Sequence, residues 1–267
     1  RPLADVARPQ RPALSLLLQD THITLPRRDD LCRHRILSES ELPKPGTLVA
    51  IDAEFVSLAQ EELEVFSDGT RTLIQPSSLA LARVSVLRGE GPHQGEPFID
   101  DHIRTTEPIV DYLTQFSGIQ PDDLDPKRTQ RTLVSHKTAY KKLRMLTDLG
   151  CRFIGHGLAK DFRIINIFVP PSQVIDTVQL YHSPAHPRNL SLRFLSWFLL
   201  KKDIQQGLAL GVEQHDGHDS IEDALAALQL FRKYEEFERD GRLEDMLEDL
   251  YEIGPRVNWR PPEKIAS

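Results

Sequence analysis

Two carboxylates stand close together in a segment that otherwise predicts a buried strand. The run from Thr47 to Val56 reads TLVAIDAEFV and contains Asp52 and Glu54. Side chains alternate along a strand, so the two acids share one face. Two neighbouring anions repel each other and resist burial unless a cation lies between them. A strand that simply ends in water at this point would explain the acids equally well, so this segment alone leaves both interpretations open.

A third acid, Asp161, lies in a predicted amphipathic helix. The segment is LAKDFRIINIF, and the residues three, four and seven positions after the acid are Ile164, Ile165 and Phe168. Asp161 therefore falls within an apolar stripe, where a carboxylate needs a partner. The helix dipole also favours an acid in the first turn. That explains its place near the helix start but not its direction, so the pattern favours a functional acid.

The stretch GHDSIEDALAALQLF predicts another helix with acids at its start. Asp219 with Glu222 three residues later fits an N-cap and its capping-box partner. His218 is then left just outside the helix. Asp223 has alanines one turn below it, which predicts that it faces the packed side. A surface position would also explain His218, because the chain has ten histidines.

These segments together provide oxygen ligands from several elements. Such ligands suit Mg²⁺ or Mn²⁺ rather than zinc. Carboxylates on different elements are typical of sites that hold two such ions, about 3.5–4 Å apart, for in-line displacement at phosphorus. A histidine, with a reference pKa of about 6.5, can take the proton from an attacking water. The predicted set is Asp52, Glu54, Asp161 and Asp223, with His218 beside them.

Composition narrows the class of protein. The chain has 267 residues, of which 39% are apolar, enough for one substantial core. No run of about 18 apolar residues occurs, so no membrane span is predicted. Cys32 and Cys151 lie far apart without a CxxC motif. They argue against a disulfide framework or a structural zinc site, and they favour a reducing compartment such as the cytoplasm.

The net charge does not determine the class of ligand. The net charge of −7 does not point to nucleic acid. Basic residues nevertheless cluster at positions 137–144 and at Lys201 and Lys202, so a phosphate ligand is not excluded. Solvated helix faces are the simpler explanation of those clusters.

The order of the predicted elements indicates a mixed α/β sheet, with leading antiparallel strands and helices on both faces. A short strand is one possibility for SLLL at positions 15–18, and a polar turn, SDGT, separates the first two main strands. Strands are predicted at 47–56, 78–89, 96–103, 151–156 and 174–181, and helices at 107–116, 135–149, 158–168, 190–202 and 220–237.

Three domain segments follow from these patterns. Residues 1–46 are rich in Pro and Arg, without an initiator Met or a signal peptide. They predict a linker or the tail of a preceding domain, in a chain that is either a fragment of a longer one or a processed form. Residues 47–240 contain the main predicted strands and helices, and 241–267 form an acidic and then Pro-containing tail.

AIDAEF, GHGLAKDF and HDSIEDA, in this order, resemble the three motifs of the DEDDh exonucleases in the ribonuclease H-like superfamily. The H-x-x-x-x-D spacing marks this subgroup, since the sister subgroup has a tyrosine. Longer stretches, such as FIGHGLAKDFRIINIFVP, resemble the nuclease domains of Pan-type poly(A) deadenylases. The resemblance covers residues 47–240. It is less certain in the long loop GLALGVEQHDG before His218, which leaves the resting position of that histidine open.

The resemblance implies a ribonuclease H-like fold and a metal-dependent 3′→5′ exoribonuclease. Asp52, Glu54, Asp161 and Asp223 would bind two Mg²⁺ or Mn²⁺ ions, and His218 would be the general base. The substrate would be the poly(A) tail of messenger RNA, the product 5′-AMP. A regulatory partner subunit would bind through regions outside residues 1–267. A general RNA or DNA exonuclease and a non-catalytic RNA-binding domain are the alternatives.

Three further residues invite functional interpretations. The resemblance places the terminal base of the substrate against Phe55, but a regular strand would turn this ring away from the acids, which favours core packing. His182 and His186 have the spacing of helical metal ligands. Prolines between and after them predict a loop instead, so no structural zinc is predicted.

Overall fold

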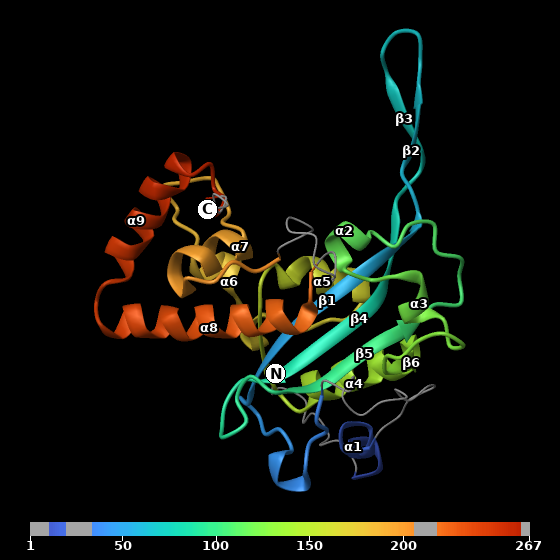
Figure 1. Cartoon of the computed structure of the whole chain (residues 1–267), viewed down its shortest axis with the longest axis horizontal. Helices are drawn as coiled ribbons and strands as arrows, with labels where there is room; N and C mark the ends of the chain where they lie inside the picture. Colours follow the sequence, from blue (N-terminus) through green and yellow to red (C-terminus); the bar gives the residue numbers. More distant parts are fainter. Residues whose placement is uncertain (1–10, 20–33, 206–217, 263–267) are drawn as a thin grey trace, which may run out of the picture.

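The computed structural model describes residues 11–19, 34–205 and 218–262. Its centre is a six-stranded sheet in the order β6-β5-β4-β1-β7-β8, drawn obliquely in Figure 1. The β1–β4 and β4–β5 pairs are antiparallel, and the other three pairs are parallel. The predicted mixed sheet with leading antiparallel strands is confirmed. The strands are β1 Leu48–Ala59, β4 Ser78–Arg88, β5 Pro97–Arg104, β6 Leu133–Ser135, β7 Arg152–Gly155 and β8 Val174–Asp176.

Helices cover both faces of the sheet, because β1 is apolar on both sides. Its Val49, Ile51 and Ala53 pack with α1, α4 and α5 in one core cluster. Its Ala50 faces a second cluster, built mainly by α6 to α9. The helices are α1 Arg11–Leu18, α4 His136–Asp148, α5 Leu158–Ile165, α6 Thr177–Leu180, α7 Leu192–Leu195, α8 Ser220–Arg239 and α9 Leu243–Arg256.

The pairing of the strand β1 with β4 is irregular next to its acids. Its pairing with β4 shifts register between Glu54 and Phe55, so the regular alternation is interrupted there. Phe55 is half-buried and packs against the first core cluster. This agrees with core packing, and contact with a substrate base stays a prediction.

Several predicted elements need correction. The segment SLLL is part of the helix α1 and not a strand, and its Leu17 is buried. The turn SDGT closes an exposed hairpin of β2 (Glu62–Val65) and β3 (Arg71–Gln75), which projects from the body in Figure 1. The helix expected at 107–116 is reduced to α2, Thr114–Ser117. The tail expected after residue 240 contains α9, which packs on the second core cluster.

Three further elements differ from their predicted extent, two of them for a local reason. The helix α5 ends early because Asn166 adopts the left-handed conformation that often terminates helices. Phe168, expected in the apolar stripe with Asp161, is therefore outside the helix and 72% exposed. The strand β8 stops at Asp176, whose carboxylate caps α6 by accepting from the Val178 N–H at 3.0 Å. The helix predicted at 190–202 is divided into α7 and a π-helical turn, Ser196–Leu200.

No helix in the described part of the chain is long and apolar enough to cross a membrane.

Candidate active site

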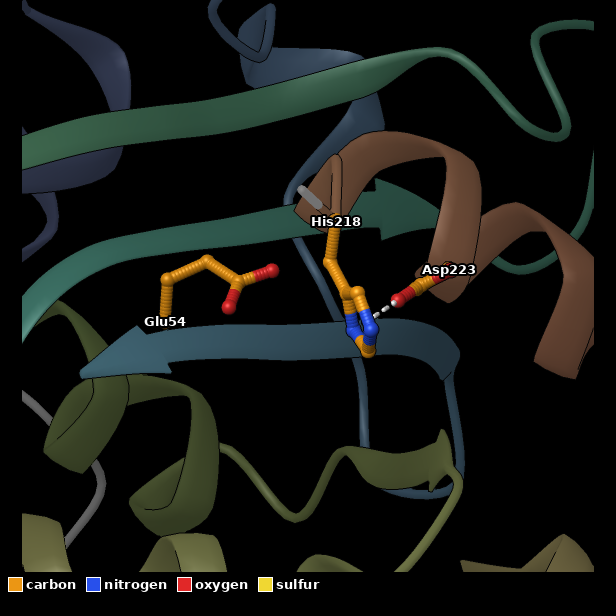
Figure 2. A group of neighbouring side chains, drawn as sticks. All are labelled: Glu54, His218 and Asp223. Atoms are coloured by element: carbon orange, nitrogen blue, oxygen red, sulfur yellow. Dashed lines mark ion pairs between the residues drawn. The ribbon is translucent and has the colours of Figure 1, made fainter. Parts of the chain in front are cut away.

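The site forms where the middle of β1 meets the start of α8. Glu54 extends from β1, Asp223 lies in the first turn of α8, and His218 precedes the N-cap of that helix (Figure 2). One ligand atom from each of these three residues lies within 4.8 Å of the others. His218 Nδ1 is 3.2 Å from Asp223 Oδ2. The structure thus brings together three of the five predicted site residues in one compact group.

The start of α8 is positioned by capping, as the sequence predicts. Asp219 is the N-cap, and its carboxylate accepts from the Ile221 N–H at 3.1 Å. His218 therefore lies just outside the helix, where its own N–H donates to the Phe116 carbonyl of α2 at 3.2 Å. The side chain of Glu222 is exposed and accepts from the backbone N–H of Gln205 at 3.5 Å.

Burial and mutual repulsion act on the acids together. Burial, followed by the charge of Asp223, raises the pKa of Glu54 to about 9. Burial, followed by the charges of Glu54, Asp223 and Asp161, holds the pKa of Asp52 well above its usual range. The charges of Asp52 and Asp161 therefore act on the same group of acids.

Asp161 is the fifth predicted site residue. It lies in the first turn of α5, and it does not belong to the described cluster of potential ligands within 4.8 Å. Burial raises its pKa to about 7, even though Lys160 lowers it. Its half-buried position resembles that of Asp52. Both acids border the site, and their predicted role as metal ligands stays a prediction.

The polar atoms of the site fit a hard divalent cation. Among the described residues, Glu54 Oε1 and Asp223 Oδ1 are buried oxygens without a hydrogen-bond partner. Leaving such groups unpaired is costly. Carboxylate oxygens are the ligands that Mg²⁺ and Mn²⁺ prefer, and a cation between them would remove both the repulsion and the missing contacts.

Gln205 belongs to the site although sequence reasoning missed it. Its Nε2 donates to Asp223 Oδ2 at 2.8 Å, and its backbone adopts a φ of 57°. No motif identifies an isolated glutamine 18 residues before the acid that it contacts. The loop GLALGVEQHDG that follows it lies outside the described residues.

His182 and His186 lie in the loop between α6 and α7, as their prolines predict. The His186 ring stacks on Tyr251 of α9, with ring centroids 4.4 Å apart. This contact gives His186 a packing role.

Comparison with known proteins identifies the family. The model of the exonuclease (RNase T) family matches residues 49–231, which include all the acids and the histidine discussed above. The chain belongs to this exonuclease family. The predicted resemblance to exonucleases is thereby confirmed.

The relatives of this exonuclease chain are much longer proteins. It is 53% identical over 254 residues to the catalytic subunit PAN2 of the PAN2–PAN3 deadenylation complex from Cryptococcus neoformans. That match covers 94% of the chain but 21% of the relative, so the chain spans about a fifth of the relative's length.

Solved structures show the same likeness. The Pan2 catalytic unit of Neurospora crassa, with protease and nuclease domains, is 47% identical, with a TM-score of 0.72. The match covers 89% of this chain and 34% of that one. The Pan2 pseudoubiquitin hydrolase–exonuclease module of Saccharomyces cerevisiae with A7 RNA is 41% identical, with a TM-score of 0.77. This match covers 93% of this chain and 37% of the yeast chain.

Proposed function

We propose that this domain is a 3′→5′ exoribonuclease that removes the poly(A) tail of messenger RNA and releases 5′-AMP. The observation that carries the proposal is the compact group of Glu54, His218 and Asp223, with its two unpaired, buried carboxylate oxygens. Membership in the exonuclease family and the likeness to Pan2 proteins support it. One of those Pan2 structures is a complex with A7 RNA.

Asp52, Glu54, Asp161 and Asp223 hold two divalent cations, Mg²⁺ or Mn²⁺, in this proposal. When bound, the ions supply an activated water and stabilise the leaving oxygen. The protein contributes the four carboxylates, of which Glu54 and Asp223 are buried. It also contributes His218, held at one end by Phe116 and at the other by Asp223.

His218 is the general base in this proposal. Its Nδ1 faces Asp223 Oδ2 at 3.2 Å, so a neutral imidazole that donates from Nδ1 leaves Nε2 free to accept a proton. A carboxylate that orients a histidine in this way also stabilises the imidazolium that forms. Transfer of the proton from the attacking water to Nε2 would generate the nucleophile for the terminal phosphodiester.

The remaining parts of the proposal concern the surroundings of the domain. Residues 1–46 are a junction with preceding sequence, 47–240 the exonuclease domain and 241–267 its C-terminal segment. The relatives are subunits of a PAN2–PAN3 complex, and a regulatory partner subunit would bind through regions outside this chain. The cytoplasm stays the predicted location.

Digestion of labelled RNA tests the function. Oligo(A), an RNA of mixed sequence and single-stranded DNA of equal length are incubated with the chain and Mg²⁺, with EDTA as the control. We expect Mg²⁺-dependent shortening from the 3′ end with 5′-AMP as product, fastest on oligo(A). Equal rates on the three substrates would support a general exonuclease instead. Binding of RNA without Mg²⁺-dependent hydrolysis would support the non-catalytic alternative.

A further inference from the structure

A buried arginine lies beside the site and belongs to none of the motifs. Arg83 is on β4, where it pairs in register with Glu54 of β1, and it is 8% exposed. Burying a guanidinium is costly unless its charge and its donors are matched. The groups that contact Arg83 therefore indicate its role in the structure.

Arg83 links the sheet to the start of α8. Its Nε donates to Asp100 Oδ1 of β5 at 2.7 Å, and its Nη1 lies 3.0 Å from Asp219 Oδ1. Asp219 is the N-cap of α8 and the neighbour of His218. A planar guanidinium can join two carboxylates in fixed directions, whereas a lysine ammonium cannot reproduce that fork.

A second contact supports the same link. Ser85, two residues along β4, donates to Asp100 Oδ1 at 2.9 Å, and its Oγ lies 2.6 Å from Ser220 Oγ. Ser85 and Ser220 are fully buried. Residues 219 and 220 are thus both tied to β4, and Asp100 orients both ties from β5.

The contacts of β4 with residues 219 and 220 affect the position of His218 more than that of Asp223. Asp223 lies inside α8, next to Ala224, Ala226 and Ala227, which are buried against the second core cluster. His218 precedes the N-cap, so its position depends on the cap and on the Phe116 carbonyl. A shift of the cap would move the histidine before it moved the acid.

We propose that Arg83 is a positioning residue, which places His218 for proton transfer by fixing the Asp219 cap against the sheet. The proposal rests on the proposed function of His218 as the general base. Arg83 itself does not touch the substrate in this account.

Arg88 offers a matched control on the same strand. It is 7% exposed, its Nε donates to Glu41 at 2.8 Å, and its Nη2 donates to the carbonyls of Arg35 and Ile36. Arg88→Lys therefore also removes the guanidinium of a buried, bridging arginine, but one whose side-chain partners do not include the α8 cap. Asp219→Asn is the second test variant, because asparagine retains helix capping while losing the charge that faces Arg83.

Kinetics on oligo(A) with saturating Mg²⁺ give the first readout. We expect Arg83→Lys and Asp219→Asn to lower kcat by about 10- to 100-fold, the loss typical of a displaced catalytic group, with little change in KM. Arg88→Lys should retain the wild-type kcat. In a His218→Gln background, Arg83→Lys should change the residual rate by less than about twofold, because groups that act through one another are not additive. A wild-type kcat in Arg83→Lys, or losses that multiply, would overturn the proposal.

Nuclear magnetic resonance of the histidine rings gives a readout that does not need activity. We expect Arg83→Lys to shift the ring signals of His218 and to leave those of His186 unchanged. Arg88→Lys should shift neither. An unmoved His218 signal would contradict the positioning role, whereas a wild-type chain without nuclease activity would contradict the proposed function instead.

Discussion

Buried acids occur on two strands of the same sheet, and the protein neutralises only one of the two groups. On β5, Asp101 is fully buried, and Lys142 Nζ of α4 lies 2.8 and 3.1 Å from its two oxygens. Asp100 beside it has Arg83 and Ser85. On β1 and α8, Glu54 and Asp223 are also buried, but each keeps an oxygen without a partner.

In the proposed function, this difference separates structural acids from metal-binding ones. The contacts of Asp100 with Arg83 and Ser85 outweigh its burial and hold its pKa below the usual range. Burial and repulsion raise the pKa of Glu54 to about 9. A buried carboxylate with its own cation stabilises the fold, whereas a group of acids that lacks one stores repulsion that an external cation can relieve.

The largest expected effect comes from removing an acid of the unsatisfied group. Asp52→Ala should lower the exonuclease rate by at least roughly 10³, as expected when metal ligation is lost. The metal-free protein should keep or gain stability, because the cost of burying this carboxyl group among other acids is removed. Activity on oligo(A) and thermal unfolding in EDTA measure the two effects. A large loss of stability would show that Asp52 is a structural acid like Asp101.

The converse experiment removes the cation of the satisfied group. Lys142→Met leaves Asp101 buried without its partner, and we expect the free energy of unfolding to fall by about 3–5 kcal/mol. The kcat on oligo(A) should stay at the wild-type value below the unfolding temperature. Lys142 is on α4, which packs on the face of the sheet opposite α8. Urea denaturation measures the stability.

A double variant sharpens this test. Lys142→Met with Asp101→Leu removes both charges, and it should recover much of the lost stability. If Lys142→Met instead abolished activity in a fully folded protein, the division into structural and functional acids would be wrong.

A smaller effect is expected in the pH dependence of metal-free stability. The folded protein holds protons on Asp161 up to about pH 7 and on Glu54 up to about pH 9. The unfolded chain loses the same protons at about pH 4. The folded state therefore binds more protons between these values, and stability falls as the pH rises from about 4 to 9.

Thermal unfolding in EDTA across this range measures that slope. Glu54→Gln should flatten it, because glutamine does not titrate, and Mn²⁺ should flatten it in the wild type. Metal-free stability that rose with pH over the whole range would contradict the raised pKa values.

The sequence predicts the elements that carry strong local signals. The strand around Asp52 and Glu54 was predicted because its apolar residues fill both faces, and the start of α8 because Asp219 is a good cap. The motifs also identified Glu54, His218 and Asp223, which the structure groups together. These features depend on spacing within one segment, which a sequence displays directly.

Contacts between distant segments were not predicted. Gln205 reaches Asp223 through the fold, and Arg83 links β4 and β5 to α8. A signal for Arg83 was present, since LALARVSVL places one cation in an apolar strand. The hairpin β2–β3 was missed because its strands are short and fully exposed, without the alternation that burial imposes.

Manganese binding tests the central claim most directly. Crystals of the chain soaked with Mn²⁺ should show anomalous density bounded by the carboxylates of Asp52, Glu54, Asp161 and Asp223, and none beside Asp101. Absence of density at the four acids, in crystals that diffract well and leave the site open to solvent, would contradict the account.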